Sequence, residues 1–136
     1  MKAVRIYETG SPEVLKIENL ELPEPAAGEV RIRHTAIGLN FQDIYTRSGQ
    51  YAAPLPTGLG TEAVGVVEGL GAGVTDFKVG DRVCYASGPV LAACATHRNY
   101  PAARLLHAPA HMQDEQIAAS LLKGMTVEYL MQRCYP

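Results

Sequence analysis

The sequence predicts a mainly β domain with short α-helices, built as an antiparallel sandwich or a partly open barrel. Over the first hundred residues, strand-like runs are separated by glycine- and proline-containing turns about eight to twelve residues apart. After residue 112 the apolar residues change to helical spacing. A chain of 136 residues is long enough for one domain with a real core and too short for two.

Four stretches have the pattern of strands. They lie at residues 2–7, 30–36, 63–68 and 81–86. Within 30–36, Val30 and Ile32 alternate with arginines and share one face with His34. Residues 22–28 contain two prolines and a glycine, which cannot continue a hydrogen-bonded ladder, so this segment is expected to be a connector.

Residues 113–133 carry apolar side chains at spacings of three, four and one, which indicates helix. Gly124 interrupts this pattern at a cost of about 1 kcal/mol relative to alanine. We therefore expect a helix near 114–122, a break over 124–126 and a second helix capped by Thr126. That second helix stops after barely two turns, and so short a helix is marginal without a packing partner.

Composition excludes several classes of function. A net charge of −2 and a pI near 6.1 argue against a broad nucleic-acid-binding or anionic-membrane-binding surface. No apolar run approaches the roughly 18 residues that span a bilayer, and the first residues do not form a signal-peptide core. We expect a cytoplasmic protein that binds neither nucleic acid nor membrane.

The number and spacing of the cysteines indicate a protein of a reducing compartment. They are Cys84, Cys94 and Cys134. No C-x-x-C pair exists, so they are expected to be small buried hydrophobic residues. Metal binding is the alternative, but Cys94 and His97 have no second pair of ligands nearby. Pro109 lies between His107 and His111 and argues against a helix there, so both histidines are expected in loops.

The densest polar cluster follows the second predicted strand. Residues 40–51 contain an amide, a carboxylate, two phenols and a guanidinium. Asn40 and Asp43 are three apart and would face the same way on a helical turn. One interpretation is a chemical site. The other is a short helix between strands, with Asn40 as its cap and Tyr45 half-buried.

Glu62 stands immediately before an apolar strand, where an unpaired carboxylate would cost several kcal/mol. It must therefore have a partner or lie in solvent at the edge of the sheet. The candidate partners are Arg47 and Arg82.

The glycines in residues 69–73 resemble a nucleotide-binding turn, but a turn and a strand follow them where a helix would be needed. A phosphate-binding role is therefore not expected. Motifs of serine hydrolases, P-loop proteins and zinc proteases are absent from the sequence.

Five ordered motifs identify a relationship. They are GLNFQDIY from residue 38, RSGQY from 47, GLGTEAVG from 58, GDRV from 80 and LKGMT from 122. Together with the first fifteen residues, they resemble the N-terminal catalytic domain of the medium-chain dehydrogenase/reductase superfamily, and most closely its quinone oxidoreductase (zeta-crystallin-like) branch. The resemblance implies a GroES-like partly open β-barrel over residues 1–112. Residues 113–136 would lead into a Rossmann domain that is absent from this chain.

The resemblance also bears on zinc. Zinc-dependent members carry a cysteine where this chain has Asn40, and a histidine where it has Thr61. Neither an amide nor a hydroxyl is a good zinc ligand, and the cysteine-rich structural-zinc lobe is missing after Val83. We expect no metal.

In the zinc-free branch the reaction is hydride transfer from NADPH to a quinone, which needs no Lewis acid because it is already electron-poor. By similarity, the nicotinamide end of the cleft would be lined by Asn40, Phe41, Asp43, Tyr45, Lys123 and Thr126. Lys123 is a weaker candidate for contact with the cofactor, because a lysine at this position could also be a solvated residue near a helix end. The residues expected to act on the acceptor are Asn40, Tyr45 and Tyr51, the phenols as hydrogen-bond donors.

The missing Rossmann domain leads to two expectations. The isolated chain should bind NADPH weakly or not at all and should not reduce quinone alone. Its C-terminal helical surface should be exposed and should favour self-association. Two alternatives remain open: a non-catalytic GroES-like binding module, and a domain of an enone or enoyl reductase.

Overall fold

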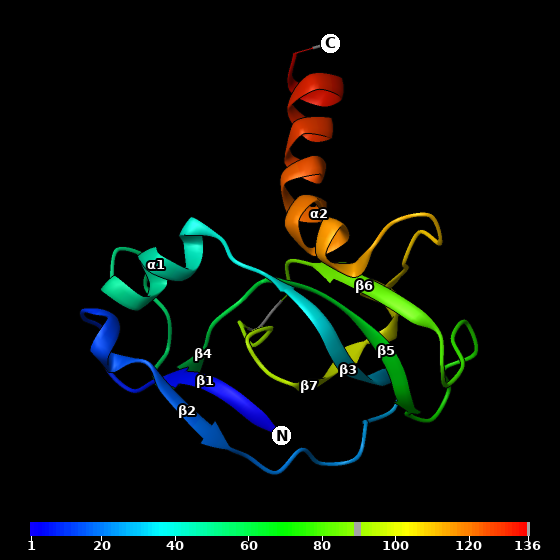
Figure 1. The fold of residues 1–136 in the computed structure, drawn as a ribbon, viewed down its shortest axis with the longest axis horizontal. Helices are drawn as coiled ribbons and strands as arrows, with labels where there is room; N and C mark the ends of the chain where they lie inside the picture. The colour runs from blue at the N-terminus through cyan, green and yellow to red at the C-terminus, as the bar shows by residue number, and fades with distance from the viewer. Residues whose placement is uncertain (89–90, 136) are drawn as a thin grey trace.

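The computed structural model describes residues 1–88 and 91–135 and shows an open barrel with two α-helices at one end (Figure 1). The strands are β1 (Lys2–Ile6), β2 (Lys16–Asn19), β3 (Glu29–Gly38), β4 (Thr57–Gly58), β5 (Glu62–Leu70), β6 (Arg82–Ala86), β7 (His97–Pro101) and β8 (Leu106–His107). The helices are η1 (Pro12–Val14), α1 (Phe41–Ser48), η2 (Ala102–Arg104), α2 (Asp114–Tyr129) and the π-helical turn η3 (Leu130–Cys134).

The strands form two antiparallel sheets. One has the order β2-β1-β4 and the other the order β7-β3-β5-β6-β8. A single bridge between Ala3 and Ala95 links β1 to the segment before β7. The sheets therefore do not close into one continuous ladder, and the predicted partly open β-barrel is confirmed.

The core lies between the sheets and is built from alternate residues of the long strands. Val30 and Ile32 of β3 are fully buried, as their alternation predicted. They pack in one cluster with Val67, Val83 and other residues of the neighbouring strands. The four predicted strands correspond to β1, β3, β5 and β6.

Four further strands, β2, β4, β7 and β8, were not predicted. β7 has the sequence HRNYP, in which one aromatic residue stands among polar ones, so no apolar alternation marks it. β8 has only two residues, and its His107 pairs with Val83. The expectation that His107 lies in a loop is therefore wrong, whereas His111 does lie in a turn.

The predicted break in the C-terminal helix is also wrong. α2 runs through Gly124 without interruption, and Thr126 donates its hydroxyl to the Leu122 carbonyl (2.9 Å) inside the helix instead of capping a new one. The cost of about 1 kcal/mol at Gly124 is too small to end the helix by itself. Pro136, the last residue of the predicted helical segment, lies outside the described residues.

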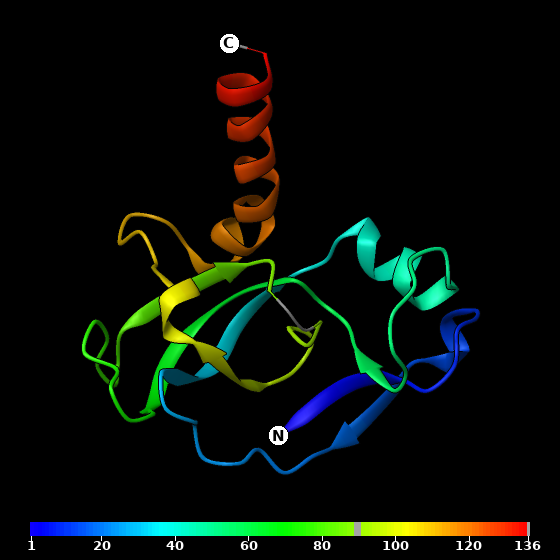
Figure 2. The same cartoon turned by 180° about the vertical axis from the view of Figure 1, so that it is seen from behind.

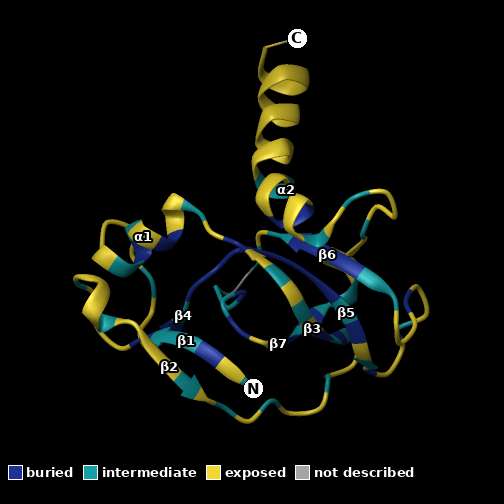
Figure 3. Cartoon of the chain, in the orientation of Figure 1, coloured by how far each residue is buried: buried dark blue, intermediate teal, exposed yellow. Residues whose placement is uncertain are grey.

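α2 projects from the barrel on the same side as α1, opposite β1 and β2 (Figures 1 and 2). Its base is buried against the sheet, whereas its later turns are exposed all round (Figure 3). The exposed C-terminal helical surface expected from the sequence is therefore present. No helix of the described residues is long and apolar enough to cross a bilayer.

The three cysteines are free and differ in exposure. Cys84 is buried, as expected, and burial raises the pKa of its thiol. Cys94 is half-buried. Burial, and to a smaller extent the nearby charge of Asp43, raises the pKa of its thiol to about 11. Cys134 is exposed on η3, so the expectation of a buried residue is wrong there.

The glycine-rich stretch after β5 has a packing role. Gly71 donates its amide to the Glu29 carbonyl (2.8 Å), and a Cβ at this position would lie 1.8 Å from the Ala26 carbonyl oxygen. Turns and then β6 follow it, as predicted, with no helix for a phosphate to meet.

A polar network crosses the interior between β3, β6 and β7. The carbonyl of Ala95 accepts a hydrogen bond from Nδ1 of His34 (2.7 Å), so Nε2 is the acceptor for the Tyr85 hydroxyl (3.1 Å). Arg98 also donates to that hydroxyl (3.4 Å) and lies over the Tyr100 ring (4.8 Å). Burial lowers the pKa of His34 to about 4 and raises that of Tyr85 to about 12.

Protonation of His34 should therefore make stability depend on pH. The unfolded imidazole titrates near its ordinary pKa of about 6.5, so the unfolded state binds more protons between pH 6.5 and pH 4. The free energy of unfolding is expected to fall as pH falls through this window. Urea unfolding at pH 7, 5.5 and 4.5 measures it. His34→Gln should make the free energy of unfolding less dependent on pH, and His111→Gln, at an exposed site, should not. If the unchanged chain and both variants show the same dependence on pH, His34 is not its cause.

Candidate functional site

The site begins where β3 ends and α1 starts. Gly38 is the last residue of β3, and a Cβ there would lie 2.3 Å from the Ala118 carbonyl oxygen and 2.5 Å from a carboxylate oxygen of Glu62. Asn40 follows in extended conformation as the N-cap of α1. The glycine thus brings β3, α2 and the Glu62 carboxylate into contact at one point.

Asp43 fixes α1 to the barrel. It is buried, and its two carboxylate oxygens accept hydrogen bonds from the backbone amides of Asn40 (3.0 Å) and Gly60 (2.8 Å). The first bond caps the helix N-terminus, where a negative charge is also favoured by the helix dipole. The prediction of a short helix with Asn40 at its cap and Tyr45 half-buried is confirmed.

Glu62 is the centre of the site, with a fully buried side chain. One carboxylate oxygen accepts the backbone amide of Leu122 (2.8 Å). The other accepts the side-chain amide of Asn40 (2.8 Å) and the ammonium of Lys123 (3.2 Å). The buried charge therefore has three donors, supplied by the N-cap of α1 and by α2.

The two arginines that the sequence suggested as partners of Glu62 are engaged elsewhere, so that expectation is wrong. Arg82 forms an ion pair with Asp114 at the start of α2 and also donates to the Met112 carbonyl (3.0 Å). Arg47 donates to the Gly10 carbonyl in the N-terminal loop. The true partner, Lys123, is 61 residues from Glu62, and no local pattern joins them.

Asn40 links the two charged residues. Its side-chain nitrogen donates to Glu62 and to the Thr61 hydroxyl (3.3 Å), and its oxygen accepts from Lys123 (2.9 Å). Both N–H donors are thereby used, while the oxygen keeps one lone pair. Asn40, Glu62 and Lys123 together are called the polar cluster below.

Beside the polar cluster, α1 and the loop after it carry three aromatic rings. The Phe41 and Tyr45 ring centroids are 6.1 Å apart, and those of Tyr45 and Tyr51 are 5.2 Å apart. Phe41 is 72% exposed, Tyr51 is 53% exposed and Tyr45 is half-buried. This aromatic surface is hydrophobic and exposed, with two phenol groups that can donate hydrogen bonds.

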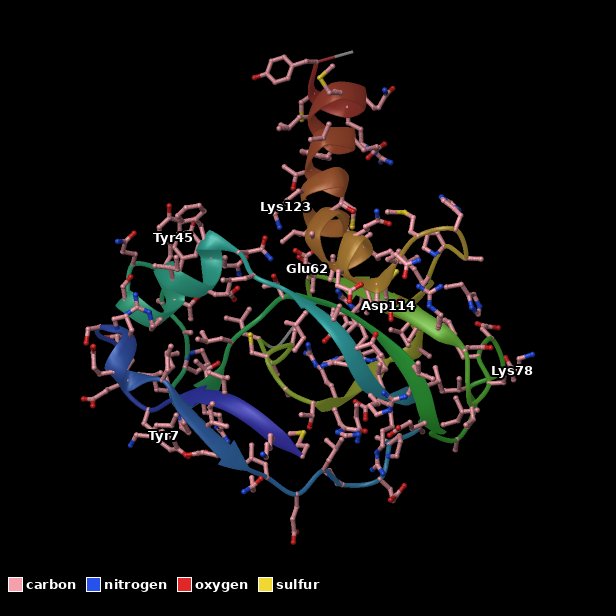
Figure 4. The ribbon with its side chains drawn as sticks, in the orientation of Figure 1. Tyr7, Tyr45, Glu62, Lys78, Asp114 and Lys123 are labelled. Carbon is pink, nitrogen blue, oxygen red and sulfur yellow. The ribbon has the colours of Figure 1, made fainter. Side chains whose placement is uncertain are left out.

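Lys123 projects from α2 on the side of α1, above Glu62, and Tyr45 lies on the upper side of α1 (Figure 4). Thr126 is one turn beyond Lys123 on the same face of α2. Its hydroxyl donates within the helix, and among the described residues it forms no hydrogen bond with the polar cluster or the aromatic surface.

The predicted site residues thus fall into connected and separate groups. Asn40 is hydrogen-bonded directly to Asp43 and to Lys123, and ring contacts join Phe41, Tyr45 and Tyr51. Thr126 stands apart. The sequence did not single out the Leu122 amide, because a backbone donor leaves no sequence signal.

The side chains of Asn40, Thr61 and Glu62 are poorly suited to bind zinc. Among the described residues, no group of three or more histidine, cysteine, aspartate or glutamate side chains could hold a metal ion. Asn40 and Thr61 offer a neutral amide and a hydroxyl, and both oxygens of Glu62 already accept hydrogen bonds.

The architecture is that of a GroES-like barrel with its polar and aromatic groups gathered at the α1 and α2 end. The model of the alcohol dehydrogenase GroES-like domain matches residues 26–132. The chain belongs to this family, and the expected relationship to the quinone oxidoreductases is confirmed by the relatives.

Three relatives illustrate the relationship. A quinone oxidoreductase of Pseudomonas aeruginosa is 48% identical over 98% of this chain and 41% of its own length. The crystal structure of Escherichia coli quinone oxidoreductase in complex with NADPH superposes with a TM-score of 0.95, at 43% identity, over 99% of this chain and 41% of that one. A 2-haloacrylate reductase of a Burkholderia species is 41% identical over 98% of this chain and 41% of its own length. The chain therefore spans about two fifths of these relatives.

Removing the central carboxylate should destabilise the barrel strongly. Glu62→Ala leaves the Leu122 amide and the Asn40 side chain without their acceptor, so we expect a loss of about 2–4 kcal/mol in urea unfolding. Glu68→Ala is the control, since its contacts with Arg33 and His97 are partly exposed to solvent and should contribute about 0–1 kcal/mol. Equal losses in the two variants would contradict the central role of Glu62.

Proposed function

We propose that this chain is the catalytic, acceptor-binding part of a zinc-independent, NADPH-dependent quinone oxidoreductase of the cytoplasm. The observation that carries the proposal is the exposed aromatic surface next to the polar cluster, on a fold that superposes on an NADPH-bound quinone oxidoreductase. Self-association through the exposed residues of α2 belongs to the same proposal.

The exposed groups fit a nicotinamide. Phe41 offers a flat ring to solvent, Asn40 keeps an acceptor for a carboxamide N–H, and the side chain of Lys123 is 55% exposed. In this proposal Asn40, Phe41, Tyr45, Lys123 and Thr126 hold the nicotinamide end. NADPH supplies the hydride when bound.

Asp43 is assigned a positioning role. It is buried, and both of its oxygens are used by backbone amides, so it acts by holding Asn40 and α1 in place. Sequence resemblance had placed it in the lining of the cofactor cleft. Its burial supports an indirect effect on the cofactor through Asn40.

The two phenols act on the acceptor. Reduction of a quinone takes one hydride and one proton and leaves a hydroquinone, with negative charge developing on a carbonyl oxygen before the proton arrives. Tyr45 and Tyr51 donate hydrogen bonds to that oxygen, which lowers the barrier where the charge forms. Because a quinone is electron-poor, these donors suffice without a Lewis acid.

Reduction of an activated double bond is the second candidate, favoured by the similarity to 2-haloacrylate reductase. The same phenols would stabilise the enolate oxygen that forms when hydride adds to an enone.

The proposal is tested by replacing the matching segment of the Escherichia coli quinone oxidoreductase with this chain. The chimera should oxidise NADPH in the presence of a quinone, and Tyr51→Phe should lower kcat/KM about 10- to 100-fold, the value of a hydrogen bond to a charged oxygen. Tyr7→Phe, at an exposed tyrosine of the N-terminal segment, should have no effect (Figure 4).

The isolated 136-residue chain serves as a second arm of that experiment. We expect this chain to bind NADPH weakly, as measured by nicotinamide fluorescence. We expect no loss of NADPH absorbance when a quinone is added. A chimera that folds and binds NADPH but reduces no acceptor would contradict the enzymatic role and favour a binding module.

Metal removal tests zinc independence. Dialysis of the chimera against a chelator should leave its rate of NADPH oxidation and its unfolding midpoint unchanged, since the donor set around Asn40 and Thr61 favours no zinc. Loss of activity that added zinc restores would refute this part of the proposal.

A further inference from the structure

We propose that a hollow between β1, β4 and β7 binds a small organic anion, namely a carboxylate with an apolar tail. The hollow is separate from the site of the proposed function, because no described residue of its lining belongs to the polar cluster or to the aromatic surface. The inference therefore stands or falls independently of that function.

The hollow has the size and the lining of a small-molecule site. Its volume is about 600 Å³, within the range of ligand-binding pockets. Strands β1, β4 and β7 line it together with parts of the segments that precede β3, β4 and β7 (Figure 1). Most of the lining side chains are apolar, among them Val4, Leu20, Leu22, Leu55 and Leu91. An apolar tail would lose its contact with water on entry, which favours binding.

Two guanidinium groups supply the positive charge. Arg5 of β1 and Arg98 of β7 both line the hollow. Arg98 is 8% exposed and lies over the rings of Tyr85 (5.3 Å) and Tyr100 (4.8 Å). Because these rings hold the guanidinium in place before a ligand arrives, little side-chain freedom is lost on binding.

Arg5 forms no ion pair with a carboxylate of the described residues. Its guanidinium donates to the Pro56 carbonyl (3.2 Å) and lies 5.8 Å from the centre of the Tyr7 ring. Its Nε is buried and has no hydrogen-bond partner in the part of the chain that the structure describes. A buried cationic donor without an acceptor is costly, and an anion held beside the guanidinium would offset that cost.

The charges of the lining favour an anion over a cation. Among the described residues the lining has one acidic side chain, Glu29, whose carboxylate accepts the backbone amide of Ala26 (3.1 Å). His97 also lines the hollow, but it contacts the Glu68 carboxylate (3.3 Å). The two arginines therefore leave an excess of positive charge between apolar walls, where attraction is screened less than in bulk water. The planar guanidinium matches a carboxylate in particular, since it can donate two parallel hydrogen bonds to it.

The test is an NMR titration of the backbone amides of the 136-residue chain at pH 7 with octanoate, 1-octanol and acetate. Octanoate has both the charge and the tail, 1-octanol lacks the charge, and acetate lacks the tail. Octanoate should shift the amide signals of β1 and β7, and the other two probes should bind at least about tenfold more weakly. No octanoate binding, or equal binding of octanoate and either other probe, would overturn the inference.

Variants of the arginines locate the site. Arg5→Gln should weaken octanoate binding about 10- to 100-fold, the value of a hydrogen bond to a charged group. Arg98→Lys keeps the charge but loses the planar fork, and should weaken binding about three- to tenfold. Arg104→Gln, at an exposed arginine of η2 outside the lining, should bind as the unchanged chain does.

The titration of Arg5→Gln decides the assignment. No effect of this variant, or an equal effect of Arg104→Gln, would contradict the proposed site. The urea-unfolding midpoint of each variant shows whether it is folded. If Arg98→Lys is not, Arg5→Gln decides alone, because its half-buried side chain lies on a short strand away from the core cluster of β3, β5 and β6.

Discussion

The buried carboxylate of Glu62 is the constraint on which this end of the molecule depends. Desolvating a carboxylate is costly unless hydrogen bonds replace its water. The side chain obtains these bonds from three donors, none of which lies near it in sequence: the Asn40 amide, the Leu122 backbone and the Lys123 ammonium. Satisfying one buried charge therefore requires β5, α1 and α2 to meet in a single arrangement.

The same requirement keeps the polar cluster in one arrangement. Asp43 holds the backbone of Asn40, and Asn40 in turn bridges Glu62 and Lys123. Side chains whose rotamers are locked by such bonds need no reorganisation when a ligand arrives. The aromatic surface is then placed beside a preformed set of polar groups.

Much of this arrangement could be predicted from the sequence, and the failures have physical causes. Alternation in residues 30–36 identified β3, and the need of Glu62 for a partner was evident from the apolar strand that follows it. The identity of that partner was not, because Lys123 reaches Glu62 only through tertiary folding. The break expected at Gly124 failed because about 1 kcal/mol of propensity does not outweigh a continuous helix.

α2 has a mechanical consequence for the whole site. Its base is fastened by the Arg82–Asp114 ion pair and, nine residues on, by the contact of Lys123 with Glu62, while the remaining turns stand free. Sixteen residues of helix extend about 24 Å. The carboxylate of Glu62 therefore holds the helix near its middle, and the direction in which α2 leaves the barrel depends on this contact.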